Sequence, residues 1–270
     1  MDAAQQLASP VALKDSRHGK ILYLKRDMYV GRSFELYGEF SQLETVLFEK
    51  LVKPGMLVVE VGANIGAHTV SLAQMVGPGG LVLAFEPQRV IFQMLCANVA
   101  LNGLFNVRTY QMGVGTAPGT LVVPPLDYAA EHNFGGVSLR QGGAGEAVPV
   151  TPLDSFNLPA LHVLKIDVEG MEAEVLGGAR RLIAQHRPMM YLENDRKEKS
   201  AALFRLVDEL GYNCWWHMPP LFNPDNFYQN QENIFPGTVS VNILCLPKES
   251  PVVVEGFRKV SGPDDLPFAR

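Results

Sequence analysis

Carboxylate and amide side chains follow two apolar segments of the chain in a way that would bring them together in a folded sheet. Asp167 comes directly after segment 162–166, and Glu193 and Asn194 come directly after segment 188–192. Parallel strands end at one edge of a sheet, where open α/β sheets bind ligands. Oxygen ligands suit Mg²⁺ or a similar ion, and the same side chains could instead bind a substrate or act as a base directly. We therefore predict Asp167, Glu193 and Asn194 as catalytic residues, and as the ligands if a divalent metal ion takes part.

Three more side chains close to these segments have simpler explanations. Glu169 opens the helix after Asp167, where any carboxylate is favourable, so it ranks below the first three. His217 follows the sixth apolar segment and would suit a hydroxyl substrate as a general base, although a packed loop histidine explains it equally. His68 is near enough to a glycine turn to touch a ligand, although a place on a helix surface is the commoner outcome. We add only His217 to the catalytic candidates.

A glycine turn joins an apolar strand to a helix at residues 60–67. A dinucleotide fingerprint would have glycines at 62, 64 and 67, but position 64 is Asn and its side chain would occupy the place of a diphosphate. Glu86 ends the next strand, where a carboxylate can accept both hydroxyls of a ribose. The alternative is a tight turn followed by a helix cap without a ligand. We predict a nucleoside site that includes Glu60, Gly62, Asn64, Gly66 and Glu86.

The hydrophobic pattern predicts the elements that would hold these residues. Apolar strands over 57–61, 81–85, 106–110, 162–166, 188–192 and 212–216 alternate with helices, among them 67–75, 90–101 and 197–210. Near-continuous apolar strands separated by helices are typical of a parallel sheet that is covered on both faces. Segment 239–246 follows without a plausible helix, so we expect that last strand to return antiparallel beside its predecessor.

The ends of the chain differ from this alternating part. We expect residues 1–55 to form an N-terminal cap, with strands over 20–25 and 28–36 and a helix over 41–52 that opens with a capping box, Ser41 and Glu44. The main domain spans 56–247. Its segment 113–155, which is rich in Gly and Pro, is predicted to be an insertion of short strands and loops. Residues 248–270 are expected to be a C-terminal tail.

Several of these segments together resemble the FkbM family of S-adenosylmethionine-dependent methyltransferases over about residues 40–195. The matching parts are the glycine turn, Phe85-Glu86-Pro87, segment 165–170 (Lys-Ile-Asp-Val-Glu-Gly) and segments 174–176 and 178–179. The resemblance implies a Rossmann-like, seven-stranded class I methyltransferase fold whose final strand is antiparallel. It also implies S-adenosylmethionine over the glycine turn with its ribose on Glu86, and the adenine near Met112 and Gly113. Glu39 would meet the methionine end, and Asp167 is counted among the cofactor contacts.

Composition excludes other classes of protein. The chain has 270 residues, 47% of them hydrophobic and 19% charged, which is ordinary for a globular protein. Its net charge of -5 lacks the basic excess of a general nucleic-acid binder. We see no apolar run long enough for a membrane span, no signal peptide at Met1-Asp2, and three cysteines without metal or redox spacing. We therefore expect a cytoplasmic protein without nucleic-acid or membrane partners, and the sequence does not give its oligomeric state.

The combined hypothesis is methyl transfer from S-adenosylmethionine to a hydroxyl oxygen of a sugar or secondary metabolite. Amide and aromatic side chains in loop 219–236 would suit a glycan-type acceptor, although a solvated loop with aromatic anchors explains them equally. Segment 133–136 is a candidate lid because it contains two glycines. One alternative is an NAD-dependent oxidoreductase, which Asn64 and the antiparallel finish weigh against. The other alternative is a protein that keeps the cofactor pocket without turnover.

Overall fold

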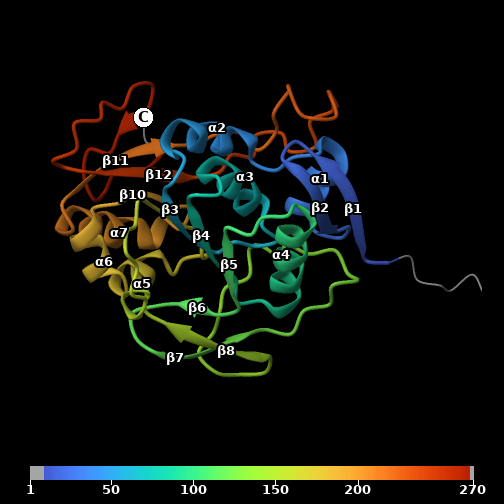
Figure 1. Ribbon diagram of the computed structural model, residues 1–270, viewed down its shortest axis with the longest axis horizontal. Coiled ribbons are helices and arrows are strands. Elements are labelled where there is room, and N and C mark those ends of the chain that lie inside the picture. Colours follow the sequence, from blue (N-terminus) through green and yellow to red (C-terminus); the bar gives the residue numbers. More distant parts are fainter. Residues whose placement is uncertain (1–8, 268–270) are drawn as a thin grey trace, which may run out of the picture.

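The computed structural model describes residues 9–267, and a mixed eight-stranded sheet forms its centre (Figure 1). The order across this sheet is β13-β11-β12-β10-β9-β3-β4-β5. These strands are β3 (Leu57–Val61), β4 (Leu81–Phe85), β5 (Val107–Tyr110), β9 (Val163–Ile166), β10 (Met189–Glu193), β11 (Tyr212–His217), β12 (Asn242–Pro247) and β13 (Arg258–Lys259).

The direction of the strands follows from the connections between them. The five strands from β5 to β10 pair in parallel, and a helix precedes most of them along the chain. Residues 218–241, all of them described, contain no helix. β12 therefore returns antiparallel to β11, as predicted, and it also inserts between β11 and β10.

The predicted count of seven strands is one too low. The additional strand, β13, has two residues and pairs antiparallel with β11 at the outer edge of the sheet. It belongs to the segment that we expected to be only a tail. A strand this short carries no hydrophobic alternation, so the sequence pattern gave no signal for it.

Helices cover both faces of the sheet. α2 (Gln42–Leu51) and α3 (Ala67–Val76) pack on one face, with α4 (Arg89–Leu101) beside α3. α5 (Glu172–Gly177), α6 (Arg180–His186) and α7 (Lys197–Glu209) pack on the other. Successive strand residues serve opposite faces: Val58 belongs to the cluster with Leu72 of α3, and Val59 to the cluster with Leu182 of α6. Both faces of β3 are therefore buried, which explains why every residue of this strand except Glu60 is apolar.

The chain between β9 and β10 forms two helices, α5 and α6, which are separated by Gly178 and Ala179. A Cβ atom at Gly178 would lie 2.0 Å from the backbone oxygen of Gly115. The chain therefore needs glycine at this close approach, and the first helix ends there.

The N-terminal region differs from its prediction. β1 (Val11–Ser16) and β2 (Gly19–Leu24) form an antiparallel hairpin, of which we predicted only the second strand. The predicted strand over 28–36 is wrong, because these residues form helix α1 (Val30–Tyr37). Asp27 Oδ1 accepts the backbone N–H groups of Tyr29 and Gly31, each at 3.0 Å, and so starts the helix. The predicted capping box is also wrong, since Ser41 makes no side-chain cap hydrogen bond.

Residues 113–151 contain a second, three-stranded sheet in the order β6-β8-β7, which lies apart from the main sheet at the lower edge of Figure 1. Its strands are β6 (Gly113–Val114), β7 (Gly119–Val123) and β8 (Glu146–Thr151), and a short 3₁₀ helix at Leu153–Ser155 follows. Segment 133–136, between β7 and β8, reaches back toward the main sheet.

Within residues 9–267, no helix combines the length and the apolar character needed to cross a membrane. The described cysteines, Cys96, Cys214 and Cys245, are all free. The absence of a signal peptide was expected from residues 1 and 2, which lie outside the described residues.

Candidate active site

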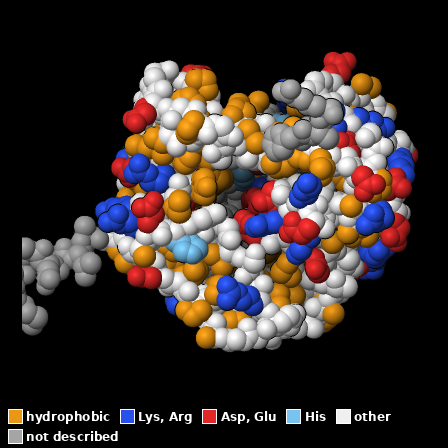
Figure 2. Space-filling model, turned by 180° about the vertical axis from the view of Figure 1, so that it is seen from behind, with side chains coloured by type: hydrophobic (Ala, Val, Ile, Leu, Met, Phe, Trp, Pro, Cys, Tyr) orange, Lys and Arg blue, Asp and Glu red, His pale blue; other side chains and the backbone are white. Residues whose placement is uncertain are grey.

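The carboxyl ends of the central strands border a cavity of about 550 Å³. Figure 2 shows a hollow in one face of the molecule, with acidic and basic side chains gathered in it. The predicted residues Gly62 and Asn64 line the cavity, and most of its other lining side chains are charged or polar. The charged residues are Glu44, Glu60, Glu86, Lys165, Asp167, Glu169, Glu193, Asp195 and Arg196.

The glycine turn brings the end of β3 against the end of β9. Gly62 and Gly66 have φ angles of 84° and 88°, which are strained for residues with a side chain. A Cβ atom at Gly62 would lie 1.7 Å from the backbone oxygen of Asp167. Asn64 also has a positive φ, and its Oδ1 accepts the N–H of Ile65 at 2.7 Å. The turn is therefore fixed by its own residues before any ligand binds.

Glu86 is a buried carboxylate that backbone donors hold in place at the end of β4. One oxygen accepts the N–H of Asn64 at 3.0 Å and the other accepts the N–H of Gln88 at 2.8 Å. Burial raises the pKa of Glu86 to about 7, and the two N–H donors oppose this change. Each oxygen keeps a free lone pair and the residue lines the cavity, so the carboxylate can accept hydrogen bonds from a diol.

A smaller cavity of about 50 Å³ continues from the first at Glu86. Met112 and Gly113, which we predicted from the family resemblance, line this second cavity together with Phe85 and Val168. Gly62, Glu86, Gly135, Asp167 and Glu169 line both cavities. The two spaces therefore adjoin, with polar groups in the larger one and more apolar groups in the smaller one.

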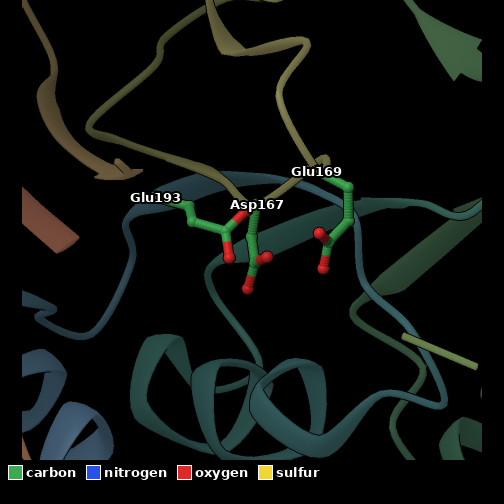
Figure 3. Close-up of side chains that lie close together, drawn as sticks. All are labelled: Asp167, Glu169 and Glu193. Carbon is green, nitrogen blue, oxygen red and sulfur yellow. The ribbon is translucent and has the colours of Figure 1, made fainter. Parts of the chain in front are cut away.

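Three carboxylates converge on the other side of the glycine turn. Oxygen atoms of Asp167, Glu169 and Glu193 all lie within 4.8 Å of one another (Figure 3). Burial and the neighbouring Asp167 raise the pKa of Glu193 well above its usual value, and they raise the pKa of Glu169 to about 7. Glu193 Oε2 is shielded from solvent and has no hydrogen-bond partner among the described residues. Glu193 therefore lacks a donor or a cation, which a ligand could supply.

Asn194, which we predicted in this cluster, is turned away from it. Its Nδ2 donates to Ser200 Oγ at 2.9 Å, and the residue does not line the cavity. Glu169, which we ranked lower, takes its place. Side chains of consecutive strand-end residues point to opposite sides, so Glu193 and Asn194 could not both face the cavity.

Predicted residues that also lie outside the large cavity include His217, Glu39 and Gly66. His217 Nδ1 is hydrogen-bonded to the Tyr191 hydroxyl at 2.7 Å, and burial lowers its pKa to about 4. Glu39 accepts hydrogen bonds from Arg17 Nε at 2.6 Å, Asn223 Nδ2 at 2.8 Å and the Phe227 N–H at 2.9 Å. These partners join distant parts of the chain, so Glu39 has a structural role in this arrangement.

Sequence reasoning gave Lys165 no role, although it lies at the centre of the charged wall. Its Nζ is 3.2 Å from Asp167 Oδ2 and 3.6 Å from Glu60 Oε1. Burial acts to lower the pKa of Lys165, but the surrounding carboxylates outweigh this and raise it. The sequence did contain a signal for Lys165, namely a lysine inside an otherwise apolar strand. A lysine is almost never buried without a partner, so this pattern predicts an ion pair.

Glu44 and Arg196 were missed as well. Glu44 comes from α2 and is 4% exposed, and burial raises its pKa to about 7. Arg196 forms ion pairs with Glu169 and with Asp195. Glu44 follows no strand motif, so only the packing of α2 reveals it, whereas Arg196 comes three residues after the end of β10.

Loop 219–236 uses its amides mainly to hold its own shape. Asn226 Nδ2 donates to the backbone oxygens of Asn223 and Asn230, and Asn230 Nδ2 donates to that of Leu36. Of this loop, only Leu221 lines the large cavity. Segment 133–136 lines it at three positions, but Phe134 is buried and its backbone is bonded to Asp27 and Gln88. The candidate lid is thus held in place at its centre.

The fold is that of class I methyltransferases. Three features are typical of this fold: the order of the seven long strands, the glycine turn after β3 and the acidic residue at the end of β4. An S-adenosylmethionine-dependent O-methyltransferase from Thermotoga maritima has a similar fold, with a TM-score of 0.50 and 13% sequence identity over 88% of this chain and 78% of that chain.

The chain belongs to the FkbM methyltransferase family, whose domain model matches residues 60–214. It is similar to Methyltransferase sdnD of Sordaria araneosa, with 31% identity over 158 residues that cover 45% of this chain and 59% of that one. Methyltransferase 1 of Beauveria bassiana is 29% identical over 143 residues, covering 45% and 57%. The match therefore spans less than two thirds of either relative.

Proposed function

We propose that this protein transfers a methyl group from S-adenosylmethionine to a hydroxyl oxygen of a small acceptor, a sugar or a secondary metabolite. The proposal rests on Glu86. This buried carboxylate accepts hydrogen bonds from two backbone N–H groups and lines both of the adjoining cavities. Membership of the FkbM family supports the reaction class.

The residues present fit the adenosyl part of this cofactor. Glu86 would accept the two ribose hydroxyls, and the more apolar cavity at Met112 and Gly113 would hold the adenine. Asn64 occupies the place of a diphosphate, so a dinucleotide fits less well. Gly62 lines both cavities, so the cofactor would lie against the backbone of the turn at this residue.

The carboxylates beyond the turn would handle the acceptor. S-adenosylmethionine supplies a methyl group that is activated by a cationic sulfur. When the acceptor oxygen takes the methyl group, the carbon–sulfur bond breaks and the sulfur becomes a neutral thioether. Glu193 or Asp167 would orient the acceptor hydroxyl by accepting its hydrogen bond and would then take its proton. The raised pKa of Glu193 favours a carboxyl group that can hold this proton near neutral pH.

A divalent metal ion is the second way in which these side chains could act. Asp167, Glu169 and Glu193 offer the hard oxygen ligands that Mg²⁺ prefers, and Glu193 Oε2 has no other described partner. The ion would help the acceptor hydroxyl to lose its proton. Arg196 already pairs with Glu169, which favours direct action of the carboxylates.

Isothermal titration of the chain with S-adenosylhomocysteine and with NAD tests the cofactor class. We expect saturable binding of S-adenosylhomocysteine and none of NAD. Binding of NAD alone would overturn the proposal in favour of an oxidoreductase.

A transfer assay with methyl-labelled S-adenosylmethionine and a panel of neutral sugars and polyols separates an enzyme from a protein that only keeps the pocket. Transfer to at least one acceptor that falls in Asp167→Ala supports the enzyme. Binding of S-adenosylhomocysteine without transfer to any acceptor supports the other alternative.

A further inference from the structure

The large cavity is lined by more acidic than basic side chains. Seven carboxylate side chains line it, against two cationic side chains, Lys165 and Arg196. The hollow in Figure 2 contains these acidic and basic groups. Charges in such a partly enclosed space interact more strongly than they would in water, because the surrounding protein has a lower effective dielectric constant.

The two cations are already engaged. Lys165 Nζ lies against Asp167 and Glu60, at 3.2 and 3.6 Å. Arg196 lies against Glu169 and against Asp195, the latter at 3.3 Å. Neither forms an ion pair with Glu193, whose carboxylate lies next to Asp167 in Figure 3.

Two polar side chains in the wall lack a partner. Glu193 Oε2 is shielded from solvent and has no hydrogen-bond donor among the described residues. His68 is 5% exposed, and its Nε2 likewise has no partner in the described part of the chain. Burial lowers the pKa of His68 well below its usual value, so the ring is neutral and adds no positive charge. The cavity is thus supplied with acceptors and short of positive charge.

We propose that this cavity selects its adenosyl ligand by positive charge, so that the chain binds S-adenosylmethionine more tightly than the neutral product S-adenosylhomocysteine. This inference rests on the proposed function, which places an adenosyl ligand in the cavity. The methyl-bearing sulfur is the only group whose charge differs between substrate and product. Loss of that charge on methyl transfer removes its attraction to Asp167 and Glu193, which would favour release of the product.

Calorimetry with three related ligands tests the proposal on the whole chain, with EDTA present to remove metal ions. The probes are S-adenosylmethionine, S-adenosylhomocysteine and sinefungin, in which an amine-bearing carbon replaces the sulfonium. The affinity for each cationic ligand should exceed that for S-adenosylhomocysteine by about tenfold or more. Two different cationic groups are used so that a hydrogen bond made by only one of them is not mistaken for an effect of charge.

Matched variants then locate the charge. Glu193→Gln should reduce this preference to about threefold or less. Glu169→Gln, which removes one of the two carboxylates paired with Arg196, provides a second measurement if the first variant folds poorly. Glu209→Gln is the control, because it removes one negative charge from an exposed ion pair with Arg180 outside the cavity. The control should keep the preference of the parent chain.

The outcomes separate this inference from the proposed function. Equal binding of the three ligands, or tighter binding of S-adenosylhomocysteine, overturns selection by charge and leaves the proposed function standing. If both Glu193→Gln and Glu169→Gln still prefer the cationic ligands as strongly as the parent chain does, selection by charge is likewise overturned. Failure of all three ligands to bind overturns the proposed function and the inference together.

Discussion

Burial changes the chemistry of individual carboxyl groups in this protein. Glu86, Glu44 and Glu169 lie in or beside the cavity, and burial raises the pKa of each to about 7. Their carboxyl groups therefore change charge in the range where an enzyme works, and small changes in their surroundings alter their function.

The pH dependence of S-adenosylhomocysteine binding should report the ionisation of Glu86. The ionised form accepts hydrogen bonds from both ribose hydroxyls, so binding should be strongest above the pKa of about 7 and should weaken by up to about tenfold between pH 8 and pH 6. Calorimetry across this range measures the effect.

Glu86→Gln is the control for this measurement. It removes a charged acceptor, so binding at pH 8 should weaken by about tenfold or more, and the dependence on pH should become shallower. Full affinity in this variant would show that the ribose does not bind at Glu86.

A titration with Mg²⁺ tests the ligand set that the structure suggests. If an ion binds here, Asp167→Asn should weaken its binding by about tenfold or more, because a charged oxygen ligand is lost. Asn194→Ala should leave the affinity unchanged, because that side chain is bonded to Ser200 outside the cavity.

Equal losses in the Asp167 and Asn194 variants would contradict this placement and would favour the metal site first predicted from the sequence. Addition of EDTA gives an independent measurement. It should abolish methyl transfer if a metal ion assists the acceptor, and should leave it unchanged if the carboxylates act directly.

At the scale of the elements, one buried lysine joins strands that carry different parts of the site. Lys165 of β9 reaches Glu60 of β3, and Glu60 Oε2 accepts a hydrogen bond from Thr69 Oγ1 of α3 at 2.6 Å. Both charged residues are almost completely buried. A buried ion pair is costly to break, because removal of one partner leaves the other charge without compensation.

Lys165→Met should therefore lower the free energy of unfolding by about 3 kcal/mol. Urea denaturation of the parent and the variant measures this loss. Lys248→Met is the control, because Lys248 pairs with Asp208 at the surface, where such a pair contributes about 0–1 kcal/mol. Equal losses in the two variants would contradict the role assigned to Lys165.

The sequence predicted the elements with strong hydrophobic patterns and missed those with mixed ones. Strands such as β3 and β9 are short apolar runs, and the glycine turn and Glu86 follow from their order along the chain. Helix α1 was mistaken for a strand, although Val30, Phe34 and Tyr37 have a helical spacing that the buried residues confirm.

The candidate site was predictable in part for the same reason. Residues directly after strands could be placed at the correct edge of the sheet. Which of two consecutive residues faces the cavity, Glu193 or Asn194, depends on the exact end of the strand. The role of Glu44 depends on how the distant helix α2 packs, which no local pattern contains.

At the scale of the whole molecule, the cavity is closed by parts of the chain outside the segment that matches the family model. Tyr29, Phe40 and Ser41 come from before residue 60, and Leu221 and Ser240 from after residue 214. Glu39 links these two regions through its bonds to Arg17, Asn223 and the Phe227 backbone. Glu39 therefore stabilises the contact between these two regions without lining the cavity itself.

Glu39→Ala should lower the free energy of unfolding by about 2–3 kcal/mol, because three donors lose a buried charged acceptor. The affinity for S-adenosylhomocysteine should change by less than about threefold, since Glu39 does not line the large cavity. Glu49→Ala at an exposed position of α2 is the control for stability.

Denaturation and calorimetry on the same Glu39 variant distinguish two roles. A stable variant that has lost its cofactor affinity would contradict the structural role of Glu39. It would support the contact with the methionine end that the family resemblance implied.

A crystal structure of the chain with S-adenosylhomocysteine tests the central claim most directly. We predict electron density for the ligand over the glycine turn, with both ribose hydroxyls within hydrogen-bond distance of Glu86 and the sulfur on the side of Asp167 and Glu193. Density for the ligand elsewhere on the surface, or an empty cavity at saturating ligand concentration, would contradict the account.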